Sequence, residues 1–345
     1  MHFKLAFIGY GTVGQGLTEI LLEKKDMLGK QYDFTYSIVA ISDIMKGSVY
    51  DKNGLDMEKI LDLVKKGKKL DEYPSGIKGW DSLKTIKETN ADTIIEVTFT
   101  DVKTGEPAIT HIKAALKSGK NVVSTNKGPV VKQATDLLKI AEKNKVYYGF
   151  EGVVLAGTPA VNLAQYTLAG NNIKGFKGIL NGTTNYILTR MEEGMSYKDA
   201  LKKAQELGYA EADPTGDVEG LDALGKVVIL TNVVLGKNIT WQNVERKGIT
   251  QISVEDVKKA KAEGKRWKLI GSSEVQANGA VKARVWPEKL PLNDPLAGVN
   301  EATNALTFFT DELGSVTIVG PGAGKRETGF SLLIDLLNIN RKMKC

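Results

Sequence analysis

Residues 3–14, FKLAFIGYGTVG, join an apolar strand to a glycine-rich turn and decide the fold class of this chain. The run Phe3–Ile8 has the length of a buried strand, and apolar residues at helical spacing follow from about Thr12 to Leu28. Between them the spacing G-x-G-x-x-G lets the backbone turn sharply and approach a pyrophosphate, which the first helix amides hold. A glycine turn without a ligand is the alternative, but the strand and helix on either side disfavour it. The candidate cofactor residues are Gly9, Gly11, Thr12, Val13 and Gly14.

The first 150 residues alternate short β-rich runs with helical spacing. The expected strands after the first one are residues 37–42, 93–99, 121–125 and 145–150, and the expected helices lie near 106–117 and 131–143. This alternation predicts an α/β domain with a doubly wound, mostly parallel sheet of the Rossmann type, over residues 1–150. Residues 44–90 are interpreted as an insertion with a helix of its own at about Met57–Lys66.

After Gly149 the pattern changes to runs of strands. The expected strands are residues 173–180, 268–276, 280–286, 305–310 and 316–319, with a hairpin turn at Asn278-Gly279. We expect an α+β second domain over residues 151–322, with helices on one side of an antiparallel sheet. A final helix at about 323–340 is expected to pack back on the first domain.

The composition is that of an ordinary globular protein of 345 residues, 42% of them hydrophobic. The net charge of +6 is spread along the chain, so we expect solvated lysine clusters and no nucleic-acid partner. No apolar run approaches the length of a membrane span, so no membrane partner is expected. The single cysteine, Cys345, gives no disulfide framework and favours a cytoplasmic location. With only His2 and His111 available, neither a histidine-based triad nor a His-ligated zinc site is expected.

Asp43, at the end of the second predicted strand, is the candidate ribose-binding residue. It follows Gly14 by 29 positions, more than the ~20 that is typical of such sites. An aspartate there would accept hydrogen bonds from both ribose hydroxyls and favour NAD. Lys46 and Lys52 nearby could instead bind the 2′-phosphate of NADP. A nicotinamide coenzyme is therefore expected, and the choice between NAD and NADP stays open.

Polar residues also end two later strands of the predicted sheet. Ligands of open α/β sheets bind at the carboxyl ends of the strands. Lys127 lies at such an end, between Asn126 and the pair Gly128-Pro129, and packing alone poorly explains a lysine there. The alternative is a surface or structural lysine without a function. The candidate residues at these ends are Thr98, Thr100, Ser124 and Lys127.

Residues 181–226 hold the candidate substrate site. Two turn-rich loops, NGTTN and GYAEADPTGDVEG, bracket a helix and open a second one, which we expect Asp217 to cap and which runs to about Leu235. Hydroxyls such as those of Thr183 and Thr184, backbone amides and carboxylates suit a small zwitterionic molecule. Glu211 or Asp217 would bind its ammonium group, and hydroxyls or amides would bind its carboxylate.

Asp222 and Lys226 form a short charged stripe on the second helix, one turn apart. If this face of the helix were exposed to solvent, polar residues would continue along it. The next residues on the same face are instead Ile229, Leu230 and Val233. A charge at a burying boundary must be paired, and such sites tend to be functional. Reduction of a carbonyl by a nicotinamide needs a proton for the developing alkoxide. In a chain with so little histidine, a lysine oriented by a carboxylate is the expected donor.

The motifs together resemble those of homoserine dehydrogenase. They are GYGTVG, SxNKGP at 124–129, NGTTNYIL, GYAEADPTGDVEGLDALGK and the late GPGAG at 320–324. The resemblance covers nearly the whole chain. It implies NAD(P)-dependent interconversion of L-aspartate 4-semialdehyde and L-homoserine, in the biosynthesis of threonine, methionine and isoleucine, by a homodimer that associates through the second-domain sheet.

The resemblance also implies roles for individual residues. Lys226 and Lys127 would lie closest to the proton transfer, and Gly322 would approach the nicotinamide. Residues expected to contact substrate are Glu211, Asp217 and Asp222. A monovalent cation, Na or K, would bind mainly to backbone carbonyls at Glu151, Val154, Ala156 and Thr158. The chain departs from the family pattern at Leu155, where a small residue is usual, and at Gly225, where an arginine is common.

Three other functions compete with this prediction. Aspartate-semialdehyde dehydrogenase requires a cysteine nucleophile, which the terminal Cys345 does not supply. A dehydrogenase for another amino acid or a sugar would keep the same frame. A protein that only senses dinucleotides would keep the glycine turn but would have no reason to bury Asp222 and Lys226.

Overall fold

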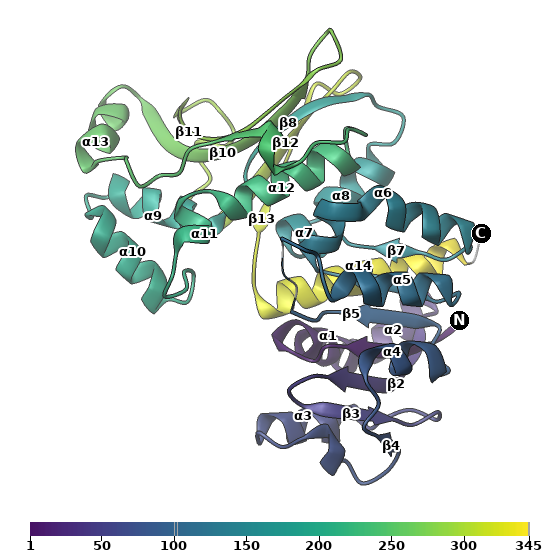
Figure 1. Cartoon of the computed structure of the whole chain (residues 1–345). Helices are drawn as coiled ribbons and strands as arrows, with labels where there is room; N and C mark the ends of the chain where they lie inside the picture. The colour runs from purple at the N-terminus through teal and green to yellow at the C-terminus, as the bar shows by residue number, and fades with distance from the viewer. Residues whose placement is uncertain (100, 102, 344–345) are drawn as a thin grey trace. The chain divides into compact units, whose positions relative to one another are not determined.

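A computed structural model describes residues 1–99, 101 and 103–343 of the chain. It divides into two compact units (Figure 1). The first comprises Met1–Gly157 and the residues from Gly324 onward, and the second is Thr158–Ala323. The sequence had placed these divisions at residues 150 and 322. Among the described residues, no helix is long and apolar enough to cross a membrane.

The sheet of the first unit is built on parallel strands, as predicted. The strands pair in the order β4-β3-β2-β1-β5-β6-β7. The parallel part consists of β1 (His2–Ile8), β2 (Thr35–Asp43), β5 (Thr93–Glu96), β6 (Asn121–Ser124) and β7 (Tyr148–Gly149). Their runs are nearly continuously apolar because both faces of the sheet are covered, and Leu5, Phe7 and Ile95 belong to one buried core.

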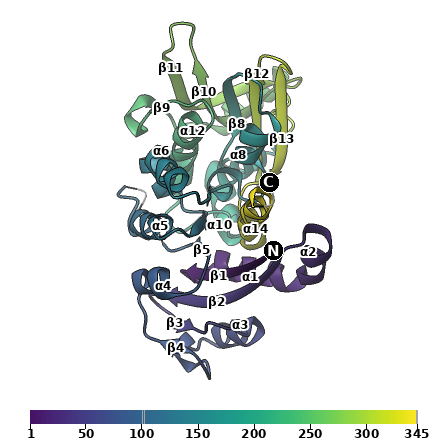
Figure 2. The same cartoon turned by 90° about the vertical axis from the view of Figure 1, so that its right-hand side faces the viewer.

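The insertion extends this sheet by two antiparallel strands that the sequence did not reveal. β3 (Gly47–Tyr50) pairs with β2, and β4 (Ile77–Lys78) pairs with β3. Figure 2 shows β1 to β4 as successive strands, with α3 (Met57–Lys65) beside β3. Strands of four and two residues are too short to produce a readable alternation. The predicted helix in this segment is confirmed.

The helices of the first unit depart most from the prediction at the end of the first helix and at the start of α6. They are α1 (Thr12–Glu23), α2 (Lys25–Tyr32), α4 (Ser82–Glu88), α5 (Ala108–Lys117), α6 (Lys127–Lys143), α7 (Gly152–Leu155) and α14 (Lys325–Lys342), with a 3-10 turn at Leu70–Glu72. The predicted single helix from Thr12 to Leu28 is wrong, because Lys24 leaves helical geometry at φ −101° and ψ 7°. Lys127 opens α6 and does not precede it.

The tail helix α14 packs against α1 within the first unit. Their backbones meet where both helices carry glycine. A Cβ at Gly16 would lie 2.4 Å from the Lys325 carbonyl oxygen, and one at Gly329 would lie 2.6 Å from the Leu17 nitrogen. Real Cβ atoms do not approach so closely, so this crossing requires glycine on both sides. The last residues of the unit are thereby held against the helix that follows the glycine turn.

The second unit contains a mainly antiparallel sheet, as predicted. Its strands pair in the order β13-β12-β8-β10-β11-β9. They are β8 (Ile173–Ile179), β9 (Val244–Arg246), β10 (Lys265–Val275), β11 (Val281–Pro291), β12 (Thr303–Thr310) and β13 (Ser315–Pro321). The pairing of β11 with β9 is parallel. Gly279 turns the β10–β11 hairpin at φ +82°, as the Asn-Gly pair predicts.

Helices α9 and α12 lie against this sheet (Figure 1). The helices of the unit are α8 (Ala160–Asn162), α9 (Gly182–Glu192), α10 (Tyr197–Glu206), α11 (Thr215–Val218), α12 (Leu221–Val233) and α13 (Val254–Ala262), with a π-helical turn at Leu163–Thr167 and a 3-10 turn at Trp241–Asn243. NGTTN is not a loop, since Asn181 caps α9 and its side chain accepts from the Thr184 amide. Asp217 does not cap the long helix either: it lies in α11, and α12 begins after Gly220.

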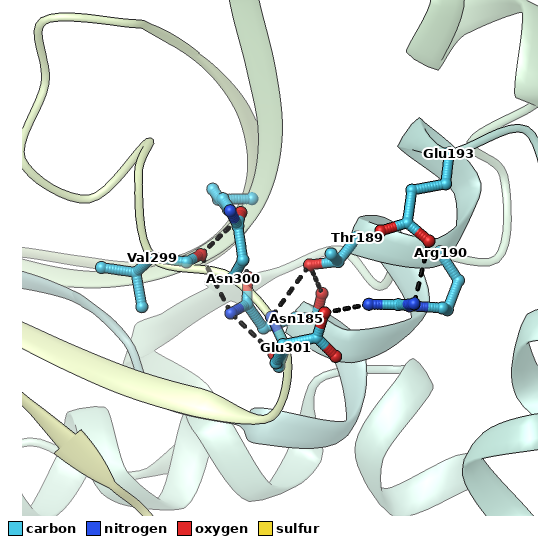
Figure 3. A network of polar contacts seen from close by, with 8 residues as sticks. Asn185, Thr189, Arg190, Glu193, Val299, Asn300 and Glu301 are labelled. Atoms are coloured by element: carbon cyan, nitrogen blue, oxygen red, sulfur yellow. Dashed lines mark hydrogen bonds and ion pairs between the residues drawn. The ribbon is translucent and has the colours of Figure 1, made fainter.

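A buried polar network ties α9 and β10 to the segment before β12. The Asn185 amide nitrogen donates to the carbonyl oxygens of Val299 at 3.1 Å and Glu301 at 2.9 Å. Figure 3 shows Asn185 beside this segment, with Arg190 directed at Glu301. The ammonium group of Lys268, which is 1% exposed, donates to Asn185 Oδ1 at 3.0 Å and to the Val299 carbonyl. These contacts fix the start of β12.

The buried lysine predicts a pH dependence of stability. Burial lowers the pKa of Lys268 from its ordinary value of 10.5 to about 8. Between these pH values the unfolded chain binds more protons than the native chain, so this group's contribution to the free energy of unfolding rises with pH, by roughly 3 kcal/mol in all. We expect the free energy of unfolding of the wild type, minus that of Lys268→Met, to increase from about pH 7.5 to about pH 10 in urea titrations.

The matched control is Lys265→Met, which removes a lysine with a side chain 42% exposed from the same strand. A difference that stays constant or falls as the pH rises would contradict the burial of a protonated Lys268.

Candidate active site

The glycine turn between β1 and α1 has the geometry of an anion cradle. Gly9 has φ +85°, and a Cβ there would lie 2.6 Å from the Val97 carbonyl oxygen, so this position requires glycine. Gly11 occupies the N-cap of α1 and brings no side chain to it. Among the described residues, no heavy atom lies within 4 Å of a Cβ built at Gly11. Thr12 and Val13 open the helix behind this space, where backbone amides favour a pyrophosphate.

The structure places Asp43 directly beside this turn. Its Oδ2 accepts from the Tyr10 amide at 2.7 Å, and its Oδ1 accepts from the amides of Met45 and Lys46, each at 2.9 Å. The Lys46 ammonium lies 3.9 Å from Oδ2. The carboxylate thus joins the end of β2 to the glycine turn. Next to it Ile44 is fully exposed.

The residues at the ends of β5 and β6 come from one edge of the sheet, since parallel strands share their carboxyl edge. Ser124 is the last residue of β6, and its hydroxyl accepts from the Asn126 amide at 3.1 Å. Asn126 is the N-cap of α6, and Lys127 is its first residue. Thr98 follows β5 by two residues. The candidate Thr100 lies outside the described residues.

In the second unit, Asp217, Asp222 and Lys226 meet at Asn181. The Lys226 ammonium lies 2.9 Å from Asp222 Oδ2 and donates to the Leu180 carbonyl oxygen at 2.6 Å. The Asn181 amide nitrogen donates to Asp217 Oδ1 at 2.7 Å and to Asp222 Oδ2 at 3.1 Å. The side chain of Lys226 is 6% exposed and that of Asp222 is 21% exposed. The charged stripe therefore sits at the edge of the buried part of α12.

This arrangement can hold and transfer a proton at a defined point. A lysine taken out of water is stabilised as an ammonium by its carboxylate partner, and it can exchange a proton with a bound hydroxyl or alkoxide. Asn181 fixes the carboxylate, because its amide bridges Asp222 and Asp217. Sequence reasoning did not assign Asn181 a role. Its place in NGTTN, which we took for a loop, was the available signal.

Thr183 and Glu211 are not part of this hydrogen-bonded cluster. The Thr183 hydroxyl donates to the Tyr209 carbonyl oxygen at 2.6 Å and so holds the loop that leads to Glu211. The Glu211 side chain is exposed, and its backbone oxygen accepts from Gln205 Nε2 at 3.1 Å. Among the described contacts, none joins the Glu211 carboxylate to Asp217.

Gly322 is a glycine for a steric reason inside the second unit. A Cβ there would lie 2.2 Å from Cγ of Asn304, whose side chain is buried on β12. Oδ1 of Asn304 would also lie 3.1 Å from a Cβ at Gly182, the first residue of α9. The GPGAG segment and the start of α9 are therefore both shaped by Asn304.

The four candidate cation residues are divided between the units. Glu151, Val154 and Ala156 lie in the first, and Thr158 opens the second. Ala156 has φ +47°, a left-handed conformation that costs a non-glycine residue about 1 kcal/mol or more. The Glu151 amide donates to Asp335 Oδ2 at 2.9 Å, and the Thr158 hydroxyl donates to the Pro321 carbonyl oxygen at 2.9 Å.

Two family models match the chain. The homoserine dehydrogenase model matches residues 159–337, which include the whole Asn181–Lys226 cluster. The model of glutamate, leucine, phenylalanine and valine dehydrogenases matches residues 4–162, which carry the glycine turn.

Individual proteins match over almost the whole length of both partners. The NAD(+)-dependent homoserine dehydrogenase of Pseudomonas canavaninivorans is 43% identical over 340 residues, which cover 99% of this chain and 97% of that protein. The homoserine dehydrogenase of Methanocaldococcus jannaschii is 41% identical over 99% of both chains. A solved structure of a hyperthermophilic archaeal homoserine dehydrogenase mutant in complex with NADPH superposes with a TM-score of 0.83 and 29% identity, covering 99% of this chain and 98% of that one. Identity of this extent, over both the glycine turn and the charged cluster, shows that the chain belongs to the homoserine dehydrogenase family.

Proposed function

We propose that this chain catalyses the NAD(P)-dependent interconversion of L-homoserine and L-aspartate 4-semialdehyde, in the biosynthesis of threonine, methionine and isoleucine. The observation that carries the proposal is the buried Lys226–Asp222 pair, joined at 2.9 Å and steadied by Asn181. Family membership supports the substrate, and the cradle at Gly11 supports the coenzyme.

Lys226 handles the proton in this proposal. The coenzyme, when bound, supplies or accepts the hydride. In the reductive direction Lys226 gives its proton to the alkoxide oxygen that forms from the aldehyde. In the oxidative direction the neutral amine takes the hydroxyl proton of homoserine. Asp222 favours the ammonium form of the lysine, and the Leu180 carbonyl fixes its direction. Lys127, at the start of α6, is the second candidate for this proton transfer.

Asp217 and Glu211 are the proposed partners of the substrate ammonium. Asp217 is anchored through Asn181, so a substrate amine would meet a carboxylate whose position is set. Thr183 lies in the first turn of α9, where backbone amides favour a carboxylate. Its own hydroxyl proton is directed at Tyr209, so we propose that this turn, and not the hydroxyl alone, binds the substrate carboxylate.

The competing proposal is a dehydrogenase for another amino acid, which the family model matched at residues 4–162 would allow. The matching family model ends at residue 162, before the first residue of the charged cluster. The residues that would select the substrate fall in the part matched by homoserine dehydrogenase. We therefore place this rival second.

We further propose a homodimer that associates through the face of the second sheet that carries Lys177. Along this face the side chains form complementary ion pairs, Lys177 with Asp294 at 2.5 Å and Arg284 with Glu288 at 2.7 Å. A hollow of about 460 Å³ lies between them and is floored partly by Ile270 and Phe309. Charges of both signs beside an apolar floor suit a self-complementary interface. We also propose that a monovalent cation binds to the backbone carbonyl groups of Glu151, Val154, Ala156 and Thr158. We propose a cytoplasmic location for the protein as well.

The reaction itself is tested by an assay with both coenzymes. Purified protein is expected to reduce NAD or NADP when L-homoserine is added, and Lys226→Ala is expected to lose about 100-fold or more in kcat, because general acid–base catalysis contributes at least this much. Coenzyme affinity, measured by fluorescence titration, is expected to stay the same.

The matched control is Lys202→Ala, which removes an exposed lysine from the neighbouring helix α10. Unchanged turnover in Lys226→Ala would refute its role in proton transfer. Absence of homoserine-dependent reduction by the wild type with either coenzyme would refute the function.

Asp43 is expected to set the choice between the coenzymes. Its carboxylate would repel a 2′-phosphate, and it holds Lys46 at 3.9 Å. Asp43→Asn keeps one of the two acceptor oxygens, replaces the other by an N–H group, removes the charge and releases Lys46. We expect the ratio of kcat/KM with NADP to that with NAD to rise by about tenfold.

Asp51→Asn, which neutralises a carboxylate just beyond β3, is the control for the loss of one negative charge. An NADP-to-NAD ratio that is the same in wild type and Asp43→Asn would contradict this role.

A further inference from the structure

Glu96 is a fully buried carboxylate at the carboxyl end of β5, and it was not among the predicted site residues. Its Oε1 accepts from the hydroxyl of Thr98 and from the Thr98 amide at 3.3 Å, and it lies 3.4 Å from Nδ1 of His111 on α5. Its Oε2 accepts from the Ser124 hydroxyl at 3.3 Å and from the Asn126 amide nitrogen at 2.5 Å. Groups from three separate segments therefore converge on one side chain.

A charge in this position is tolerated because its hydrogen-bonding capacity is filled. An ionised carboxylate offers about four lone-pair sites, and burial without partners would cost several kcal/mol. Burial, and then the negative charges of Glu96 and Asp335, raise the pKa of the nearby Tyr148 phenol well above its ordinary value. The surroundings of Glu96 are therefore dry, and its hydrogen bonds are correspondingly hard to replace by water.

The groups that Glu96 holds are those that border the proposed coenzyme site. Thr98 belongs to the segment that leaves β5, and Ser124 ends β6. Asn126 is the residue from which α6 starts, so the direction of Lys127 depends on it. In parallel sheets this edge is where ligands bind.

We propose that Glu96 is a positioning residue for the coenzyme and for Lys127, which acts by locking the segments after β5 and β6 to each other. This inference rests on the proposed function. Glu96 does not touch a reacting atom. It fixes the distance between Thr98 and Asn126, and His111 braces it from α5. A glutamine at this position keeps one acceptor oxygen and replaces the other by an N–H group, so the hydrogen bonds accepted on that side are lost and the link between the two segments weakens.

The test is direct coenzyme binding to Glu96→Gln, measured by fluorescence titration with NAD and with NADP in the absence of homoserine. We expect the Kd of the coenzyme that the wild type prefers to rise by about tenfold, together with a fall in kcat and an unchanged KM for homoserine. A merely structural lesion would lower the fraction of molecules that bind and leave Kd unchanged.

The matched control is Asp92→Asn, the same change of acid to amide at the other end of β5. Asp92 is partly buried and accepts from the Lys4 amide at 2.7 Å and from the Thr93 hydroxyl at 2.8 Å. We expect it to lower thermal stability and leave the coenzyme Kd as in the wild type. An equal rise in Kd in both variants, or no rise in Glu96→Gln, would overturn the proposal.

Asn126→Ala provides a second route if Glu96→Gln does not fold, because Asn126 is only partly buried and its loss removes one of the hydrogen bonds that Glu96 accepts. The same rise in Kd is expected, and an unchanged Kd would overturn the proposal. Since these titrations contain no homoserine, they remain decisive even if the chain fails to oxidise homoserine, which would refute the proposed function alone.

Discussion

Buried charges constrain this chain more than any other feature, because each must be surrounded by hydrogen bonds supplied from distant parts of the sequence. Glu96 draws together the segments after β5 and β6. Lys226 is held by its partner Asp222 and by the Leu180 carbonyl, 46 residues away. Lys268 joins β10 to α9 and to the segment before β12. In each case the charge fixes the place where a strand or helix ends.

These fixed ends are also where the candidate chemistry lies. Groups that act on a substrate work best when their positions are set before it arrives, so that no reorganisation is needed during the reaction. The glycine turn is set by the contact of Gly9 with Val97 and by the bond from Tyr10 to Asp43. Lys226, the proposed proton donor, is held by Asp222, and Asn181 holds that carboxylate in turn.

Much of the fold and part of the candidate site could be predicted from the sequence, because they depend on the spacing of residues that are close together in the chain. The parallel strands, the antiparallel second sheet, the glycine turn and the pairing of Asp222 with Lys226 all follow from spacings of a few residues. The break at Lys24, the strands β3 and β4 and the short helix α11 were missed, because each is too short or is imposed by packing. Glu96 and Lys268 could not be found, since most of their partners lie tens of residues away, and Asn181 was overlooked because it opens a segment predicted as a loop. Glu211, one of the two residues predicted to bind a substrate ammonium, has its side chain at the surface.

The proposed reaction requires direct hydride transfer between homoserine and a nicotinamide coenzyme. Its most direct test uses L-homoserine deuterated at the carbon that carries the side-chain hydroxyl, followed by mass spectrometry of the reduced coenzyme. The account predicts that the reduced coenzyme gains one deuterium and that the aldehyde product keeps the other. Reduced coenzyme without deuterium would contradict it.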